Sequence, residues 1–273
     1  YNSFKFKWGF GNILIPLMLC SCDMISPRLN ALSLWLVIDG LLLMLLSLVI
    51  DGGVNAGWTS YVPLSIYNYS SIDLMFFPLH IVGFSSLLGS INSIITILKS
   101  CNLSILYCSL FIPLFPWSLF YTSLLLIVSL PVLAGCITMI IFDRHFNTSF
   151  FDPIRGGDLS LFQHLFRFSG HPEVYILILP AFGIVSEVIS KFTQCIIFGR
   201  DSMSIAIILI AFIGCIVWGH HMFMVGFDID TRTYSTTATS IIAIPTGIKI
   251  LNWLGTIWSG SYWLITPLFF IIG

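Results

Sequence analysis

The stretch His164-Leu-Phe-Arg-Phe-Ser-Gly-His-Pro-Glu-Val-Tyr175 places two histidines, an arginine, a glutamate and a tyrosine at the front of a strongly apolar run. In hydrocarbon an ionisable side chain costs at least about 2.5–3.5 kcal/mol at mid-helix depth, so such a cluster normally lines a bundle interior, a cofactor or a wet cavity. His171 and Tyr175 are four residues apart and share one face of a helix, whereas Glu173 points away from that face. We therefore expect this stretch to carry chemistry.

Composition places the stretch in an integral membrane protein. Hydrophobic residues make up 57% of the 273 residues, charged residues only 8%, and the mean hydropathy is +0.99. The formal net charge of −1 provides neither a basic surface for nucleic acid nor an acidic tail. The seven cysteines include no CxxC pair, so we expect helix-packing thiols rather than metal or disulfide chemistry.

Apolar windows between turn signals predict an all-α integral membrane helix bundle that forms one membrane domain over residues 1–273. We expect about six transmembrane helices and a partial helix at each end. The predicted spans are 31–50, 73–97, 115–142, 160–189, 203–225 and 238–258, and the partial helices are 13–20 and 262–273. A half-spanning helix needs protein to cover its free backbone groups, so the chain is expected to be the middle of something larger.

The sharpest candidate site comprises His171, His220 and His221. Three imidazoles in hydrocarbon without carboxylate partners suit copper or zinc better than a hard cation. Adjacent residues of an ideal helix point about 100° apart, so His220 and His221 can reach one ion only if that helix end is distorted. Taken alone, a membrane histidine pair is more often a hydrogen-bonding pair, and spacing leaves that alternative open.

Other polar residues each have a structural and a functional interpretation. Glu173 is either a hydrogen-bonded core carboxylic acid or a proton relay. Lys249, with Thr246 one helical turn away, is either a lysine that extends to the membrane interface or a buried amine that passes protons. Asp23 lies in a loop near the membrane surface, together with Asn12 and Asn30. Its carboxylate either caps that loop or collects protons.

Five motifs follow one another along the chain. They are Asp143-Arg-His-Phe-Asn-Thr148, Gly170-His-Pro-Glu-Val-Tyr-Ile-Leu-Ile-Leu-Pro180, Val217-Trp-Gly-His-His-Met-Phe223, Asp228-Ile-Asp-Thr-Arg232 and Ile242-Ala-Ile-Pro-Thr-Gly-Ile-Lys249. In this order they closely resemble subunit I of mitochondrial cytochrome c oxidase, of the haem–copper oxidase superfamily, from about Trp8 to Trp258. The resemblance implies electron transfer from cytochrome c to oxygen, forming water and pumping protons, in the mitochondrial inner membrane.

The resemblance also implies roles for single residues. His171, His220 and His221 would bind the copper that faces the high-spin haem. Tyr175 would be bonded covalently to His171 and would supply an electron and a proton when the oxygen bond breaks. Glu173 would be the branch-point acid of one proton path, and a second path would end at Tyr175. The first path would comprise Asp23, Asn12, Asn30, Ser33, Ser85 and Ser86, and the second Ser186, Lys249 and Thr246.

Haem a and haem a3 would be bound mainly by partner chains. The family's haem ligands are an early histidine, before this chain begins, and a late His-x-His pair, which this chain lacks. The remaining histidines, His80, His145 and His164, fall at non-ligand positions. We expect the central segment of a split subunit, with helices three to eight and parts of two and nine of a twelve-helix subunit. Its partners would be the remaining fragments of subunit I, oxidase subunits II and III, accessory subunits, cytochrome c and membrane lipid.

Three departures from the family pattern each add an ionisable group at membrane depth, where it needs a partner. Arg167 replaces a tryptophan and is either a new charge or the partner of a haem propionate. Glu187 replaces a histidine, and Ile38-Asp39 replaces a proline pair. Two alternatives to the split oxidase stay open: a non-catalytic membrane scaffold derived from that subunit, and a partial copy of a normal one.

Overall fold

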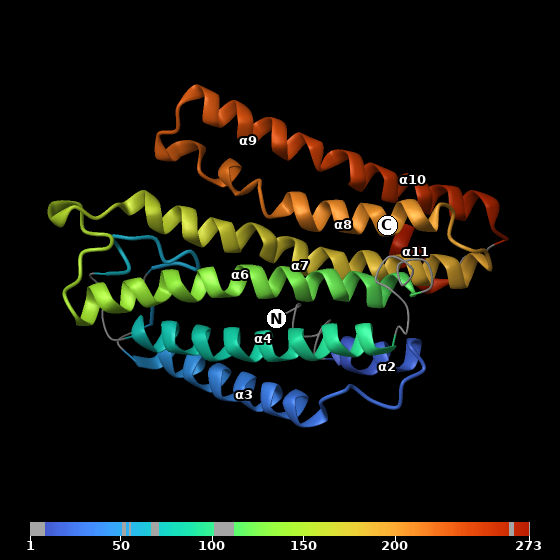
Figure 1. Ribbon diagram of the computed structural model, residues 1–273, viewed down its shortest axis with the longest axis horizontal. Helices are drawn as coiled ribbons and strands as arrows, with labels where there is room; N and C mark the ends of the chain where they lie inside the picture. The colour runs from blue at the N-terminus through green and yellow to red at the C-terminus, as the bar shows by residue number, and fades with distance from the viewer. Residues whose placement is uncertain are drawn as a thin grey trace.

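The computed structural model describes residues 9–50, 53–54, 56–66, 71–100, 112–261 and 265–272. Every regular element in these ranges is helical (Figure 1). The longer helices are α3 (Pro27–Val49), α4 (Asp73–Ser100), α6 (Leu114–His145), α7 (Leu159–Thr193), α8 (Arg200–Gly214), α9 (Ile229–Ile241) and α10 (Ala243–Ser259). The short ones are α2 (Asn12–Met18), α11 (Thr266–Ile272) and the 3-10 turns η3 (Pro153–Arg155), η4 (Trp218–His221) and η5 (Phe223–Val225).

Five helical runs in the described ranges are long and apolar enough to cross a membrane. They are α3, α4, α6, α7 and the run Ile229–Ser259, which joins α9 to α10. These runs match five of the predicted spans, although the last begins nine residues earlier than predicted. The prediction of an all-α membrane helix bundle is confirmed. The partial helices correspond to α2 and α11, and residues 262–264 and 273 of the second lie outside the described residues.

The predicted span 203–225 is wrong in its second half. Helix α8 ends at Gly214, and η4 and η5 replace the expected helix. The ring of Tyr175 blocks the space beside Gly214, because a β-carbon built there would lie 2.7 Å from Cδ2 of that ring. The amide of Cys215 then bonds the carbonyl of Phe212, which is the tighter pattern of a 3-10 turn. The helix thus ends inside an apolar run, with Gly214 packed against the ring of Tyr175.

The long helices lie side by side in a sequential order (Figure 1). Helix α3 forms one edge and packs on α4, α4 packs on α6, and α6 packs on α7. Helices α8 and α10 pack on the other side of α7, and α9 packs on η4 and α10. Gly183 brings α7 close to α6, since a β-carbon there would lie 2.5 Å from Oγ of Ser118 and 2.9 Å from Cα of Phe115. Small residues allow such close helix contacts in membranes.

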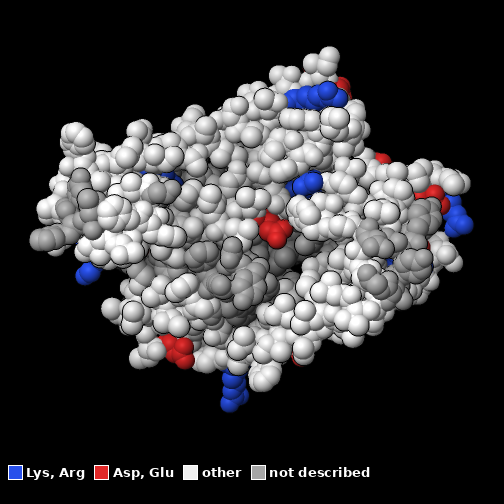
Figure 2. Space-filling view, turned by 180° about the vertical axis from the view of Figure 1, so that it is seen from behind, with Lys and Arg blue, Asp and Glu red and all other residues white. Residues whose placement is uncertain are grey.

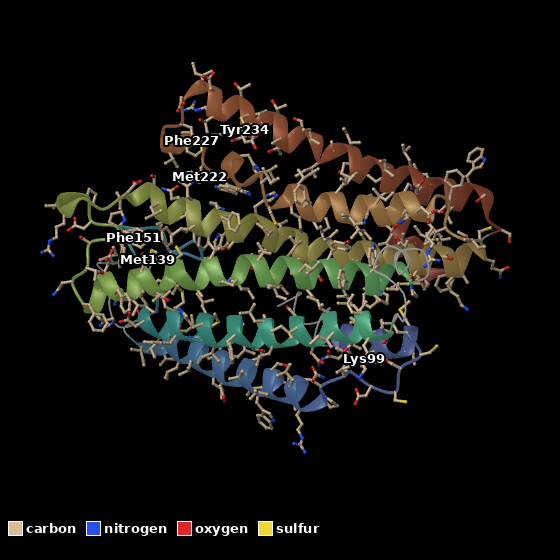
Figure 3. All side chains as sticks on the ribbon, viewed as in Figure 1. Lys99, Met139, Phe151, Met222, Phe227 and Tyr234 are labelled. Atoms are coloured by element: carbon tan, nitrogen blue, oxygen red, sulfur yellow. The ribbon has the colours of Figure 1, made fainter. Side chains whose placement is uncertain are left out.

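Two apolar cores hold the bundle. One lies where α6, α7 and α8 meet and includes Trp117 and Leu179. The other joins α4, α6 and the start of α7 and includes Phe151 and Phe162, with Met139 packed against it (Figure 3). Charged side chains on the face shown in Figure 2 lie mainly toward its edges, and near the middle a small acidic spot lies close to a basic side chain, beside a hollow. Much of that surface is uncharged, as expected where lipid or other helices make contact.

The polar loop between α6 and α7 is folded around the carboxylate of Asp143. This group accepts hydrogen bonds from the hydroxyl of Thr148 and from the amides of Phe150 and Phe151, the last two at 3.0 and 2.9 Å. Asp158 then caps α7. The loop thereby fixes where α7, the helix of the central stretch, begins.

Candidate functional site

Helix α7 and the turn η4 bring three histidines together. His171 lies on α7 and is only 6% exposed, whereas His220 and His221 lie on η4. One ring nitrogen from each histidine lies within 4.8 Å of the others. Nδ1 of His171 is 3.1 Å from Nε2 of His221, and the ring centroids of His171 and His220 are 4.7 Å apart. The 3-10 turn supplies the distortion that lets two adjacent histidines face one point.

Thr239, on α9, orients one of these rings. Its hydroxyl donates to the carbonyl of Ser235 at 2.7 Å and lies 3.1 Å from Nδ1 of His220. A hydroxyl has one proton, so it accepts from Nδ1–H of His220, and Nε2 is then the lone-pair nitrogen. Thr239 could not be singled out from the sequence, because it lies in a segment rich in serine and threonine, Thr231 to Ser240.

Tyr175 lies against His171 one turn along α7. The two ring centroids are 4.6 Å apart and the rings are inclined at 72°. On its other side the tyrosine ring packs on Gly214 at the end of α8. Nε2 of His171 is buried and has no hydrogen-bond partner among the described residues. Its Nδ1 faces the other two histidines, so the two nitrogens of this ring have different surroundings.

The histidine cluster fits a borderline or soft metal ion. It offers three imidazoles, and the structure places no carboxylate or thiol of the described residues among them. One buried ring nitrogen lacks a partner, and a hydroxyl fixes the tautomer of a second ring. This donor set suits copper or zinc and is poor for calcium or magnesium, which prefer oxygen ligands.

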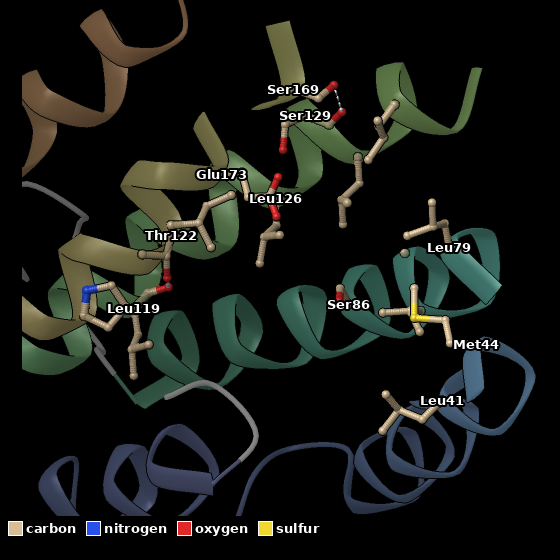
Figure 4. Close-up of a pocket in the computed structure, with 16 residues that line it drawn as sticks. Leu41, Met44, Leu79, Ser86, Leu119, Thr122, Leu126, Ser129, Ser169 and Glu173 are labelled. Atoms are coloured by element: carbon tan, nitrogen blue, oxygen red, sulfur yellow. Dashed lines mark hydrogen bonds between the residues drawn. The ribbon is translucent and has the colours of Figure 1, made fainter. Parts of the chain in front are cut away.

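Glu173 points into a cavity of about 230 Å³ between α3, α4, α6 and α7 (Figure 4). Glu173 is exposed and is one of the residues that line this cavity. Its lining is mainly aliphatic, including Leu41, Met44 and Leu126, with a few hydroxyls such as Ser86. The carboxyl group thus faces away from the histidines and into a largely apolar space.

Comparison with known proteins decides the family. Residues 3–273 match the family model described as cytochrome C and quinol oxidase polypeptide I. The chain belongs to this family. It is 51% identical over 270 residues to cytochrome c oxidase subunit 1 of Pecten maximus, covering 97% of this chain and 56% of that protein. The corresponding subunits of Candida albicans and Yarrowia lipolytica are 46% and 48% identical over 268 residues, covering 97% of this chain and 50% of each. The chain spans about half the length of these relatives.

Hydrogen bonds join most of the residues expected in the first proton path of this oxidase polypeptide I chain. The amide of Asn12 donates to Oδ1 of Asn30 at 2.8 Å. Ser33 donates to the carbonyl of Asn30, and Ser85 donates to the carbonyl of Ser33, both at 2.6 Å. Ser86, the next residue, lines the cavity that holds Glu173.

Asp23 does not join this series through any contact that the structure describes. It is exposed, and its carboxylate accepts the amide of Met24 at 2.7 Å, which is a loop cap. The structural interpretation of this residue therefore has direct support.

The second expected path is less continuous. Lys249 is 1% exposed and has no hydrogen bond or ion pair to another described residue, but its Nζ lies 4.5 Å from the ring centroid of Phe182. The hydroxyl of Ser186 donates to the carbonyl of Phe182 and accepts from Nε1 of Trp253, at 2.7 and 2.9 Å. Thr246 donates to Ile242 within its own helix. Lys249 is thus buried rather than at the interface, and its ammonium group lies over the face of an aromatic ring.

Two departures from the family pattern have partners within the chain. Nε of Arg167 donates to the hydroxyl of Tyr61 at 2.8 Å, and its guanidinium lies 5.5–5.9 Å from the ring centroids of Tyr61, Phe166 and Trp58. Glu187 accepts the amide of Leu114 at 2.9 Å and so satisfies the first turn of α6. The sequence left Arg167 as either a new charge or the partner of a haem propionate, and it offered no partner for Glu187.

The three non-ligand histidines lie apart from the cluster. His80 bonds Phe76 and Thr138, and His145 lies 3.1 Å from the carboxylate of Asp73. Nδ1 of His164 accepts from the indole of Trp218 at 3.3 Å. The five described cysteines are free thiols: Cys20, Cys22, Cys136, Cys195 and Cys215.

Proposed function

We propose that this chain is the part of a cytochrome c oxidase subunit I that binds copper at the oxygen-reducing site and carries parts of two proton paths. The observation that carries the proposal is the convergence of His171, His220 and His221 with Tyr175 in contact. Family membership and the names of the relatives support it. The reaction would be the reduction of oxygen to water by electrons from cytochrome c, coupled to proton pumping across the mitochondrial inner membrane.

The chain's own residues have distinct tasks in this proposal. His171, His220 and His221 would bind copper, which when bound supplies an electron and an open coordination position for oxygen. Thr239 keeps Nε2 of His220 free by accepting from Nδ1–H. The hydroxyl of Tyr175 holds a transferable proton beside His171. Gly214 permits that position, because a larger residue would occupy the space of the tyrosine ring.

Proton delivery is assigned to two further groups. Glu173 would hold a proton in the cavity, at the end of the series from Asn12 to Ser86. Lys249 would hold one between α7 and α10, on the path toward Tyr175. The face of Phe182 supports a cationic amine there without accepting its proton.

The haems would be bound mainly by residues of partner chains, because these 273 residues contain no His-x-His pair of the kind that the family uses. We propose haem a and haem a3 as cofactors of the assembled protein. The remainder of subunit I, subunits II and III, accessory subunits and cytochrome c would be its partners.

The test is mass spectrometry of the native membrane complex. Trypsin cuts after Arg167 and Lys191, so one peptide contains both His171 and Tyr175. A covalent bond between the two rings would lower the mass of that peptide by two hydrogens and suppress fragmentation between residues 171 and 175. Nε2 of His171, the ring nitrogen without a partner, is the expected attachment atom. A Tyr175→Phe variant is the matched control and should lack the mass loss. Recovery of the unmodified peptide in quantity would contradict the oxidase and leave the non-catalytic scaffold as the better account.

A further inference from the structure

Helix α3 carries an acidic side chain on its outer surface near the middle of the span. Asp39 is exposed, lies twelve residues after Pro27 and ten before Val49, and has no hydrogen bond or ion pair with any described residue. Helix α3 is the outermost helix on its side of the bundle (Figure 1) and is the least buried of the spans. A carboxylate at this depth is unfavourable in lipid and needs a partner.

The rotation of α3 about its axis fixes where Asp39 points. The buried residues Ser33, Val37, Gly40 and Ser47 form one stripe that faces α4. Gly40 is in tight contact, since a β-carbon there would lie 2.6 Å from Cγ2 of Val82. Successive residues differ by about 100°, so Asp39 points to the side of α3. The cavity of Glu173 is lined from α3 by Leu41 and Met44, and Asp39 is not among its lining residues.

We propose that this side of α3 binds a transmembrane segment of another polypeptide, which places a lysine or arginine at the depth of Asp39. We infer that the partner residue is basic because, where water is absent, a lysine or arginine can form an ion pair with the carboxylate. Trp35, Leu42 and Leu46 flank Asp39 at helical spacing and are 64%, 60% and 45% exposed. They give the partner helix an apolar surface around the ion pair.

A second copy of this chain does not provide that basic group from its described residues. Arg167 is held by Tyr61, and Lys249 is buried. The other described basic residues lie in loops or near helix ends, as Lys99 does at the end of α4 (Figure 3). These are Arg28, Lys99, Arg144, Arg155, Lys191, Arg200 and Arg232.

Photo-cross-linking in the native membrane complex tests the proposal. A photoreactive side chain replaces Leu42, one turn from Asp39, and a control replaces Leu48, which is 65% exposed and, nine residues after Asp39, points to the opposite side of α3. Position 42 should give a cross-linked peptide from another polypeptide whose membrane segment contains lysine or arginine, in higher yield than position 48. Cross-links from position 42 only to lipid, to a segment without a basic residue, to a second copy, or to residues 1–8 of this chain would overturn the proposal.

Charge variants provide the second measurement. At a fixed detergent concentration, Asp39→Leu should lower retention of the cross-linked polypeptide about five- to tenfold, and Asp39→Lys should lower it further. Replacement of the partner's basic residue by aspartate should restore retention in the Asp39→Lys complex. Ile38→Leu is the control, and retention should not change. Unchanged or increased retention with Asp39→Leu would show that the site faces lipid and overturn the proposal.

Discussion

Glu187 illustrates how a single membrane carboxylate is stabilised by a partner distant in sequence. Its Oε1 accepts the amide of Leu114, 73 residues earlier, at the first turn of α6. A helix N-terminus has unpaired amides and a partial positive charge, so a carboxylate is a favourable partner there. The residue therefore links α7 to the start of α6.

Removal of this carboxylate should loosen the start of α6. We expect Glu187→Ala to destabilise the assembled protein by about 1 kcal/mol, since one helix amide loses its partner in an apolar setting. Glu187→Gln keeps the accepting oxygen and should retain most of that stability. The midpoint of thermal denaturation in detergent checks both. Equal midpoints for the two variants would contradict the capping role.

A substitution of Lys249 should affect the stability of the protein and its proton transfer in different ways. Lys249→Met keeps the length of the side chain and removes a buried amine that has only the face of Phe182 as a partner. The thermal midpoint should therefore stay the same or rise. If Lys249 carries protons, turnover of the assembled oxidase should fall about a hundredfold or more. Full turnover in this variant would exclude Lys249 from the path.

At the scale of an element, the break after α8 determines the geometry of the site. The break at Gly214 lets η4 turn two adjacent histidines toward His171. The same glycine provides space for the ring of Tyr175. One element boundary thus places residues from α7 and from η4 in a single cluster.

A methyl group at this boundary should disturb the cluster. Gly214→Ala would place a carbon 2.7 Å from the ring of Tyr175, so the ring or α8 must shift, at a cost of about 1–3 kcal/mol. If His171 and Tyr175 are bonded as proposed, we expect a lower yield of their cross-linked peptide. Gly135→Ala on α6 is the control, because no heavy atom lies within 4 Å of the added carbon. An unchanged yield in the Gly214→Ala protein would contradict the steric argument.

The start of α7 should depend on pH through Asp158. Its carboxylate accepts the hydroxyl and the amide of Ser160 at 2.7 and 2.8 Å, and these hydrogen bonds lower the pKa of Asp158. A pKa that is lower in the folded state than in the unfolded state means that the cap stabilises the helix above the unfolded value of about 3.8 and is lost as the pH falls through the folded pKa. Hydrogen-exchange protection of the first turn of α7 should fall below about pH 4, by a small amount because the group is exposed. The decrease should be weaker in Asp158→Asn, and an identical decrease would contradict the assignment.

At the scale of the whole molecule, the connections between the helices lie at two opposite ends of the bundle. The α2–α3 and α7–α8 connections lie at one end, and the loop between α6 and α7 lies at the other (Figure 1). Both of these ends must meet water if the long helices span a bilayer. The arrangement therefore fixes which loops share a side of the membrane.

Thiol labelling should show this topology. Cys20 and Cys22 are exposed at one end, and Ile154, at the other end, is 93% exposed. In sealed vesicles a membrane-impermeant maleimide should label Cys20 and Cys22 from one side only. The cysteine of an Ile154→Cys variant should be labelled only from the opposite side. Labelling of all three positions from the same side would contradict a bundle that spans the membrane.

Sequence patterns predicted the long helices well because each is a long apolar window between polar loops. They failed between Met203 and Val225, where the residues after Gly214 stay apolar and hydropathy cannot register the break. The three histidines stand out since ionisable groups are rare in such a chain. Thr239 and Phe182 do not, because hydroxyls and aromatics are common in it, and only the packing of α9 and α7 gives them partners.

A metal ion bound by the histidine cluster would also reduce the conformational entropy of the unfolded chain. His171 and His221 are 50 positions apart, and one ion held by both would close a loop of that length. By the chain-entropy argument used for disulfides, such a closure removes freedom from the unfolded state worth about 4 kcal/mol. A metal bound at this site would therefore stabilise the packing of α7, α8 and η4, and, if the proposed copper is present, its removal by a chelator should lower the midpoint of thermal denaturation.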